Sequence, residues 1–397
     1  MIPSWSLDSW KKYENNHEFR YPDQTKLPDI LQNLRASPPL VHSSEIERLK
    51  LAIALAGRGQ AFILQAGDCA ESFHDFKSLH VTQQINLLLT MSGIISHGSS
   101  LPVVTIGRIA GQYAKPRTLA DETRDGLTLP SYNGDLINQC SFNSASRQHN
   151  PDFLMSGYYY SKITHGLIDD CLSENNQSLY TSHEALHIPY EQSLSREVDG
   201  KWYLLSTHLP WIGMRTAFRL SAHVEFLRGM NNPIGVKVGP NISPEVLVQL
   251  VERLNPLAED GRLLLITRMG ADLLEDKLPA LINAVKKCGI PVTWSCDPMH
   301  GNSIYTNKGI KTRHMDAIFC ELQKSIFTHA QMSSVFAGAH FEITAQNVTE
   351  CVGGKINIKE DELNNAYHSL LDPRLNKDQS IEIAEYLRHY LFNKEFL

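Results

Sequence analysis

The chain has 397 residues, of which 42% are hydrophobic and 20% are charged, and its formal net charge is −6. This length suits one large α/β barrel with an extension, and the mixed charges argue against wholesale disorder. The acidic balance excludes a general nucleic-acid-binding protein. No apolar run approaches the ~20 residues that a membrane-spanning helix requires, so we expect no membrane partner.

The cysteines and the N-terminal residues indicate the cellular compartment in which the protein is expected. The seven cysteines are odd in number and form no CxxC pair, so a disulfide framework is not expected and a reducing cytosol is the simpler interpretation. The first 16 residues lack the apolar core of a secretory signal. We therefore expect a cytoplasmic protein.

The N-terminal part is rich in proline and aromatic residues and predicts an arm with short helical pieces. A helix is expected over 44–57, where Ser44 and Glu47 have the spacing of a capping box ahead of an apolar face. We predict that 1–58 form an arm and a helix that pack on a barrel formed by 59–397, since no linker is evident.

A recurring pattern dominates the rest of the chain: short apolar runs that carry or precede an ionisable residue. Eight such runs cover 61–67, 103–107, 178–182, 202–207, 234–239, 262–267, 291–296 and 338–344. Helical patterns fall between several runs, at 243–254 (with Ser243 as N-cap), 278–288 and 314–330. Apolar strands that alternate with helices predict a buried parallel sheet, and eight of them predict a (β/α)8 TIM barrel. In such barrels the active site lies at the carboxyl ends of the strands, where the ionisable residues fall here.

Four residues far apart in the sequence are candidate metal ligands: Cys69, His300, Glu342 and Asp372. Three of them follow or lie on predicted strands, so a barrel would bring them together. A sulfur, nitrogen and oxygen donor set suits a divalent first-row metal such as Mn2+, Co2+, Fe2+ or Zn2+. Each residue alone also has an ordinary explanation, because a cysteine after a strand is usually a small buried hydrophobe.

Six cations form a second candidate set: Arg108, Lys115, Arg117, Arg215, Lys237 and Arg268. Lys237 interrupts an apolar strand, and a buried lysine requires an anionic partner or a shifted pKa. A phosphate or carboxylate ligand would supply that partner, and ordinary salt bridges are the alternative. The segment 107–117, GRIAGQYAKPR, has the look of a phosphate loop, although it is neither a Walker A loop nor a dinucleotide fingerprint.

Ten strings in this chain resemble class II 3-deoxy-7-phosphoheptulonate (DAHP) synthases, in order and over roughly residues 60–380. They are QAGDCAESF, GRIAGQYAKPR, SHEAL, THLPWIGMRT, NPIGVKVGPNISPE, GRLLLITRMGA, WSCDPMHGN, KTRH, FEITAQNVTECVGG and DPRLN. The resemblance implies a (β/α)8 barrel with an N-terminal extension, and it implies a homo-oligomer.

The resemblance also implies roles for single residues. The metal ligands would be Cys69, His300, Glu342 and Asp372. Phosphoenolpyruvate would be bound by Arg108, Arg215, Lys237 and Arg268. The aldose phosphate would be bound by Lys115, Arg117 and Thr118. The catalytic groups would be Lys237, Arg108, Glu184 and Lys115.

The implied activity is that of a transferase. It condenses phosphoenolpyruvate with erythrose 4-phosphate and gives 3-deoxy-7-phosphoheptulonate and phosphate, in the first step of the shikimate pathway and aromatic amino acid biosynthesis or in a specialised secondary-metabolite copy. A divalent metal would polarise the aldehyde. C3 of phosphoenolpyruvate then attacks the carbonyl carbon, water adds at C2, and phosphate leaves with C–O cleavage.

The chain departs from the family pattern after THLPWIG. Met214 stands where we expect a glutamate, Ala217 where we expect an arginine, and Leu220-Ser221 where we expect Asp-Gly. A thioether cannot relay a proton to the attacking water. One alternative is therefore a synthase for a different aldose phosphate or an amino-analogue. Another is a degenerate metal- or phosphate-binding barrel with a regulatory role, against which the retained ligands and cations argue.

Overall fold

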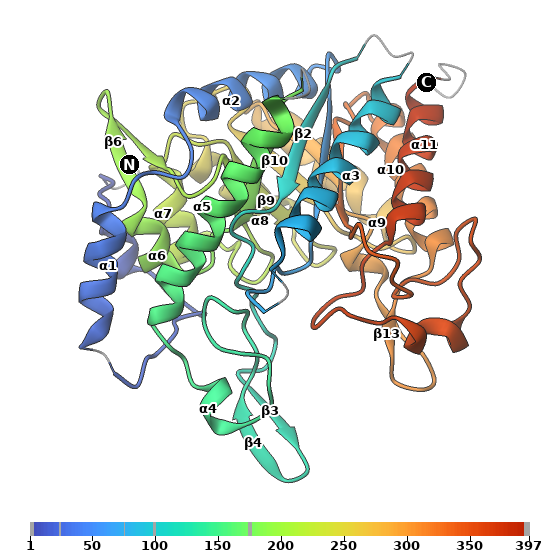
Figure 1. The fold of residues 1–397 in the computed structure, drawn as a ribbon. Coiled ribbons are helices and arrows are strands. Elements are labelled where there is room, and N and C mark those ends of the chain that lie inside the picture. Colours follow the sequence, from blue (N-terminus) through green and yellow to red (C-terminus); the bar gives the residue numbers. More distant parts are fainter. Residues whose placement is uncertain (1–3, 24, 75, 98–100, 174–176, 393–397) are drawn as a thin grey trace.

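The structure is a computed structural model that describes residues 4–392 except 24, 75, 98–100 and 174–176. Eight parallel strands close into a barrel in the order β1-β14-β11-β10-β9-β8-β5-β2 (Figure 1). Their bounds are Phe62–Gly67 (β1), Val103–Arg108 (β2), Tyr180–Glu184 (β5), Leu209–Ile212 (β8), Ile234–Val238 (β9), Leu263–Thr267 (β10), Thr293–Cys296 (β11) and Gly338–Glu342 (β14). The predicted (β/α)8 TIM barrel is confirmed.

Helices surround this barrel. They are α3 (Ser78–Ser96), α5 (Asp152–Ser173), α6 (Ile188–Ser193), α7 (Ala222–Arg228), α8 (Pro244–Leu254), α9 (Leu274–Cys288), α10 (Met315–Gln331) and α11 (Lys377–Phe392). The three helices predicted after residue 240 are confirmed, and Ser243 Oγ accepts the N–H of Val246 at 3.3 Å as an N-cap. Among the described residues no helix has the length and apolar character to cross a membrane.

One predicted barrel strand is wrong. The run 202–207 falls mostly in β7 (Lys201–Leu204), which pairs antiparallel with β6 (Ser195–Val198) outside the barrel. The barrel position belongs instead to β8, only four residues long, in which Pro210 pairs with His183 of β5. A short strand that contains proline carries little periodicity and no β-ladder donor at that residue, so a search for apolar runs passes over it.

Helix α2 (Ser43–Gly57) closes the amino-terminal end of the barrel. Leu49, Ile53 and Ala56 on α2 are fully buried and pack in one cluster with inward-facing strand residues, including Ile63 and Leu264. The inner side chains of the strands and this helix therefore form one core, while the outward-facing strand residues pack against the surrounding helices in separate clusters.

The predicted cap of α2 is shifted by two residues. The backbone N–H of His42 donates to Glu45 Oε2 at 2.9 Å, so the capping residue is His42 in place of Ser44, and the helix begins at Ser43, one residue before the predicted range of 44–57. Glu47 instead accepts a hydrogen bond from the Tyr203 hydroxyl at 2.6 Å, which ties α2 to β7. The carboxylate of Glu47, which the local spacing assigned to the helix cap, therefore makes a tertiary contact instead.

The N-terminal arm contains the short helices η1 (Ser9–Lys12) and α1 (Lys26–Ala36). Trp5 Nε1 donates to the carbonyl of Glu225 at 3.0 Å, and the N–H of Ala222 donates to the carbonyl of Glu14 at 2.8 Å. The arm thereby packs along α7 and the end of the loop that follows β8.

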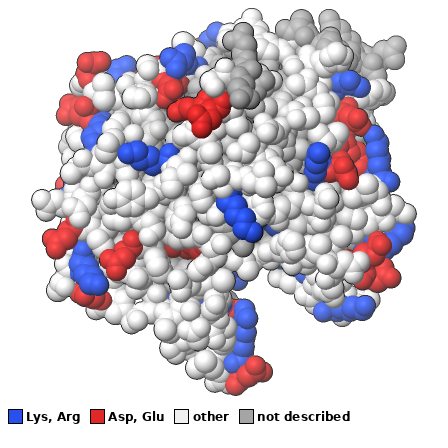
Figure 2. All heavy atoms as spheres, in the orientation of Figure 1, with Lys and Arg blue, Asp and Glu red and all other residues white. Residues whose placement is uncertain are grey.

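The carboxyl end of the barrel carries the irregular segments. They are the hairpin β3 (Asp121–Arg124) and β4 (Leu127–Pro130), α4 (Ser144–Arg147), η2 (His300–Asn302), the hairpin β12 (Ile304–Tyr305) and β13 (Lys311–Thr312), and η3 (Glu360–Asn365). The β3–β4 hairpin and the β12–β13 region extend from the same side of the body (Figure 1). In the same orientation the surface is hollowed between these two projections, and acidic and basic side chains are intermixed around the visible face (Figure 2).

We predict that Ile53→Ala lowers the free energy of unfolding by about 2–5 kcal/mol, because it leaves a cavity in the core that α2 shares with the strands. Denaturant unfolding followed by circular dichroism measures this change. Leu51→Ala on the same helix is the matched control, since Leu51 is 68% exposed and its truncation should change stability by less than about 0.5 kcal/mol. Equal effects of the two variants would contradict the role of α2 in closing the barrel.

Candidate metal centre and anion site

The four candidate ligands meet at the carboxyl end of the barrel. Cys69 follows β1, Glu342 is the last residue of β14, His300 lies in η2 after β11, and Asp372 precedes α11. One ligand atom each of Cys69, Glu342 and Asp372 lies within 4.8 Å of the others. His300 Nε2 is 3.0 Å from Glu342 Oε1 and 3.8 Å from Asp372 Oδ2. Strands β1 and β14 are adjacent, with Gly67 opposite Glu342, and this register brings the thiol to the carboxylate.

The chemistry of these donors fits a divalent cation. A thiol, an imidazole and two carboxylates form a mixed set that first-row divalent metals accept. Burial, with a further contribution from Glu342, raises the pKa of the Cys69 thiol to about 12. Because a metal binds the thiolate, such a thiol would release its proton when a cation binds.

Positive groups surround the buried carboxylate of Glu342. Burial alone would raise its pKa, but His300, Lys115, Arg313 and Arg108 outweigh burial and hold the pKa well below its ordinary value. Arg313 Nη2 lies 2.8 Å from Oε2, and Arg108 Nη2 lies 3.2 Å from Oε1. Glu342 is therefore a charged carboxylate in a fully buried position.

The loop after β2 brings Lys115 to the same cluster. Lys115 Nζ is 2.7 Å from Cys69 Sγ and forms an ion pair with Asp372, which Lys311 also contacts. Thr118, three residues further on, accepts a hydrogen bond from Arg215 Nη2 at 2.6 Å. Arg117 lies half-buried between Lys115 and Thr118. The structure thus places Lys115 at the cluster and Thr118 at Arg215, and Arg117 lies between them in the sequence.

Three further cations lie on a barrel strand or directly after one. Lys237 of β9 is buried and its Nζ is 2.5 Å from Asp297 Oδ2. Arg268 follows β10 and donates to the carbonyl of His300 at 3.0 Å. Arg108 ends β2, and its guanidinium carbon lies 5.3 Å from the centre of the Trp211 ring. The buried Nε atoms of Arg108 and Arg268 have no partner among the described residues, which leaves each arginine with a donor for a ligand.

Glu184, the last residue of β5, lies among these cations. Burial raises its pKa, and the positive charges of Lys115, Arg215, Arg108 and Lys237 oppose this effect. Its buried Oε1 has no hydrogen-bond partner among the described residues.

The loop after β8 packs closely against this carboxylate. A Cβ atom at Gly213 would collide with Glu184 Oε1, and one at Gly239 would collide with the sulfur of Met214. The loop that carries the unexpected Met214 therefore lies directly beside Glu184.

The segment 107–117 is predicted to be a phosphate loop, but its backbone N–H groups at 110–112 are not available to bind a phosphate. The N–H groups of Ala110, Gly111 and Gln112 all donate to the carboxylate of Glu71, at 3.1, 2.9 and 2.8 Å. Ala110 has a φ of 62°, so the loop holds a strained turn around this carboxylate. These three N–H groups already have an acceptor, and anion binding by the loop depends on the side chains that follow them.

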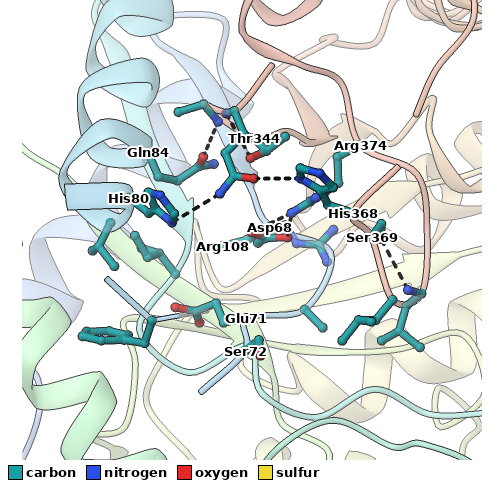
Figure 3. Close-up of a pocket in the computed structure, with 18 of the residues that line it drawn as sticks. Asp68, Glu71, Ser72, His80, Gln84, Arg108, Thr344, His368, Ser369 and Arg374 are labelled. Carbon is teal, nitrogen blue, oxygen red and sulfur yellow. Dashed lines mark hydrogen bonds and ion pairs between the residues drawn. The ribbon is translucent and has the colours of Figure 1, made fainter. Parts of the chain in front are cut away.

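A cavity of about 500 Å³ opens beside the metal cluster (Figure 3). Arg108 and Asp68 line it near the cluster, while His80 and His368 line it from α3 and from the segment before Asp372. The Gln346 side chain is hydrogen-bonded to both of these histidines at 3.3 Å. The cavity is lined by sequence neighbours of Cys69 and Asp372, whereas none of the four candidate ligands is among its lining residues.

Several structurally important residues were not predicted as site residues. Arg374 bonds Asp68 at 3.0 Å and Glu350 at 2.8 Å, so it joins the segments that carry Cys69 and Asp372. Asp297 contacts Lys237 and His300. Asp297 directly follows a predicted strand, and this position could have identified it as a site residue from the sequence. The partners of Arg374 come from distant parts of the chain and carry no local signal.

These features define a (β/α)8 barrel with a cluster of candidate metal ligands and a set of cations at the carboxyl ends of its strands. A family model described as the class-II DAHP synthetase family matches residues 5–175 and 169–388. The chain belongs to this family, which confirms the resemblance in its sequence.

Two curated relatives match most of the chain. One is 37% identical over 429 aligned positions, covers 95% of each chain, and is named phospho-2-dehydro-3-deoxyheptonate aldolase from Streptomyces coelicolor. The other, of the same name from Neurospora crassa, is 36% identical and covers 96% of this chain and 93% of its own. A solved structure of phospho-2-dehydro-3-deoxyheptonate aldolase from Francisella tularensis is similar in fold, with a TM-score of 0.53, 16% identity, and coverage of 91% and 95%.

We predict that Glu71→Ala loosens the loop that carries Lys115, because three N–H groups lose their carboxyl acceptor. Hydrogen exchange measured by mass spectrometry should show protection of residues 110–112 falling at least about tenfold, since three hydrogen bonds worth about 0.5–1.5 kcal/mol each are lost together. Glu197→Ala, at an exposed position of β6, is the control and should leave this loop unchanged. Unaltered protection in Glu71→Ala would show that the carboxylate does not hold the loop.

Proposed function

We propose that this protein is a divalent-metal-dependent DAHP synthase. It condenses phosphoenolpyruvate with erythrose 4-phosphate and releases 3-deoxy-7-phosphoheptulonate and phosphate. The observation that carries the proposal is the convergence of Cys69, His300, Glu342 and Asp372 with the predicted cations at one barrel end in a member of the class-II family. The names of the curated relatives favour this reaction over a different acceptor or a regulatory barrel.

In this proposal the metal is Mn2+ or Co2+, with Fe2+ and Zn2+ as further candidates for the same donors. When bound, it supplies Lewis-acid polarisation of the aldehyde carbonyl. Asp297 accepts His300 Nδ1 at 2.7 Å and leaves Nε2 directed at Glu342, so the imidazole is already oriented for a metal. Arg313 and Arg374 hold the surrounding carboxylates in place from outside the cluster.

The cations of the site bind the two anionic substrates. Arg108, Arg215, Lys237 and Arg268 hold phosphoenolpyruvate, and Lys115, Arg117 and Thr118 hold the aldose phosphate. A new bond forms between C3 of phosphoenolpyruvate and the aldehyde carbon, water adds to C2, and the C–O bond to the phosphate breaks. Fixed positive groups stabilise the negative charge on the carboxylate and departing phosphate without reorganising.

Glu184 is the acid–base group that we assign to this site. Met214 offers no carboxylate, whereas the buried Oε1 of Glu184 has no partner among the described residues and lies beside the same loop. Burial raises its pKa, which makes the carboxylate a stronger base than a solvated glutamate. The carboxylate can accept a proton from the water that adds at C2.

The decisive experiment measures phosphate release and phosphoenolpyruvate consumption by the purified protein with erythrose 4-phosphate and Mn2+ or Co2+, against an EDTA control. Turnover that depends on the metal and yields 3-deoxy-7-phosphoheptulonate supports the proposal. Phosphoenolpyruvate binding without turnover would direct a screen of other aldose phosphates and amino-analogues. Absence of both binding and turnover would contradict a synthase.

We expect Cys69→Ser to abolish metal-dependent turnover and weaken metal binding while the fold stays intact, because a hydroxyl is a poor substitute for a thiolate ligand. A Co2+ titration followed by visible absorption reports the loss of the thiolate ligand, and circular dichroism reports the fold. Cys288→Ser, on α9 outside the cluster, is the control and should behave as the wild type. Full activity of Cys69→Ser at low metal concentration would refute the ligand assignment.

We expect phosphoenolpyruvate affinity to fall as the pH rises through about 8. Burial lowers the pKa of Lys237 to about 8 despite the opposing effect of Asp297, so the ammonium is charged below this pH and neutral above it. The dissociation constant should therefore rise by about tenfold per pH unit above 8, as loss of one bound proton requires. Calorimetric titration from pH 6.5 to 9.5 measures it.

Lys237→Arg is the control for this titration, because a guanidinium remains charged throughout and should flatten the profile. A flat wild-type profile would mean that Lys237 does not carry the charge that binds the substrate.

A further inference from the structure

Asp297 lies at the centre of a small hydrogen-bond network between two parts of the site. It directly follows β11 and is fully buried. Its Oδ2 is 2.5 Å from Lys237 Nζ and 2.7 Å from His300 Nδ1. Its Oδ1 accepts the N–H groups of Met299 and His300 at 3.0 and 3.1 Å, and its own N–H donates to the carbonyl of Thr267 at 2.7 Å. One carboxylate oxygen is thus shared by a lysine and a histidine.

The two partners come from different structural elements. Lys237 lies on β9, which is separated from β11 by β10 in the barrel order. His300 lies in η2, three residues beyond Asp297, and its other nitrogen is 3.0 Å from Glu342. A purely structural ion pair would need only one of these partners. The shared oxygen instead fixes the direction of both the ammonium and the imidazole.

We propose that Asp297 is a positioning residue that serves both halves of the site: it orients His300 toward the metal cluster and holds the charged ammonium of Lys237 where phosphoenolpyruvate binds. The inference rests on the proposed function, because the roles of Lys237 and His300 do. Hydrogen-bond partners of metal-binding histidines set ring orientation and ligand basicity, and their loss typically weakens metal binding 10–100-fold.

The charged state of the Lys237 ammonium depends on Asp297 because of the other charges around it. The charged or titratable groups that face it are Asp297, Arg108, Arg268, Glu184 and His340. Both arginines oppose the ammonium charge, and among the described residues Asp297 is the one that forms an ion pair with it. Without this carboxylate, a buried ammonium next to two guanidinium groups loses its proton at a lower pH.

The test is Asp297→Asn, which keeps the shape and removes the charge. We expect Mn2+ affinity, measured by electron paramagnetic resonance titration, to fall 10–100-fold. We also expect the pH profile of phosphoenolpyruvate binding to move to lower pH by about one unit or more, so that affinity is reduced at pH 7.5 and recovers toward pH 6. A residue with a merely structural role would change neither readout in the folded protein.

Glu225→Gln is the matched control, because Glu225 is equally buried but pairs with Arg228 and Arg253 away from the barrel mouth. It should leave both readouts unchanged. Asp297→Glu tests the proposal if Asp297→Asn fails to fold, since it keeps the charge but displaces it by one methylene. It should weaken Mn2+ binding and leave the pH profile near that of the wild type.

The outcomes separate this inference from the proposed function. A wild-type protein that binds neither Mn2+ nor phosphoenolpyruvate would overturn the proposed function. If the wild type binds both and Asp297→Asn changes neither, or changes only one of the two, the shared positioning role is wrong. Loss of both with Glu225→Gln unaffected supports it.

Discussion

The carboxylate of Glu342 is the group on which the rest of the site depends. It is fully buried, and a buried charge persists only where opposite charges and hydrogen bonds compensate for the lost water. Arg313 and Arg108 contact its two oxygens, and Lys115 and His300 approach it from the site. Removing this one charge would leave the buried guanidinium groups of Arg313 and Arg108 without an ion-pair partner among the described residues. Positive groups at the end of β2, after β11 and after β13 thus meet at this one carboxylate.

The barrel explains why residues so distant in the sequence share this point. Every parallel strand ends on the same side of the barrel, so the inward-facing residues near the strand ends and the loops that follow them surround one mouth. The pairing of β1 with β14 sets Gly67 opposite Glu342, and the pairing of β1 with β2 sets Gly67 opposite Arg108 as well. A single shift of register would turn these side chains to the other face of the sheet. The metal cluster is therefore a consequence of strand register.

The parts of the fold that local patterns determine could be predicted, and the parts that tertiary contacts determine could not. The apolar runs around β9 and β10 indicated barrel strands because their residues are buried on both faces. Strand β8 escaped notice because Pro210 interrupts a four-residue segment. The strand-end rule indicated Arg108 and Glu342, yet it could not show that Glu71 already fills the backbone turn of the following loop. Such an assignment depends on a partner about 40 residues away.

The departure at Met214 becomes intelligible from the packing around Glu184. Met214 is 42% exposed, and its sulfur lies so close to Gly239 that a larger residue at 239 would not fit. The thioether therefore covers the end of β9, next to the strand that carries Lys237. A glutamate at 214 would add a second carboxylate on the loop that packs against Glu184, and two neighbouring carboxylates raise each other's pKa. With a neutral side chain at 214, Glu184 is, under the proposed function, the one carboxylate left in this place to exchange a proton with the water that adds at C2.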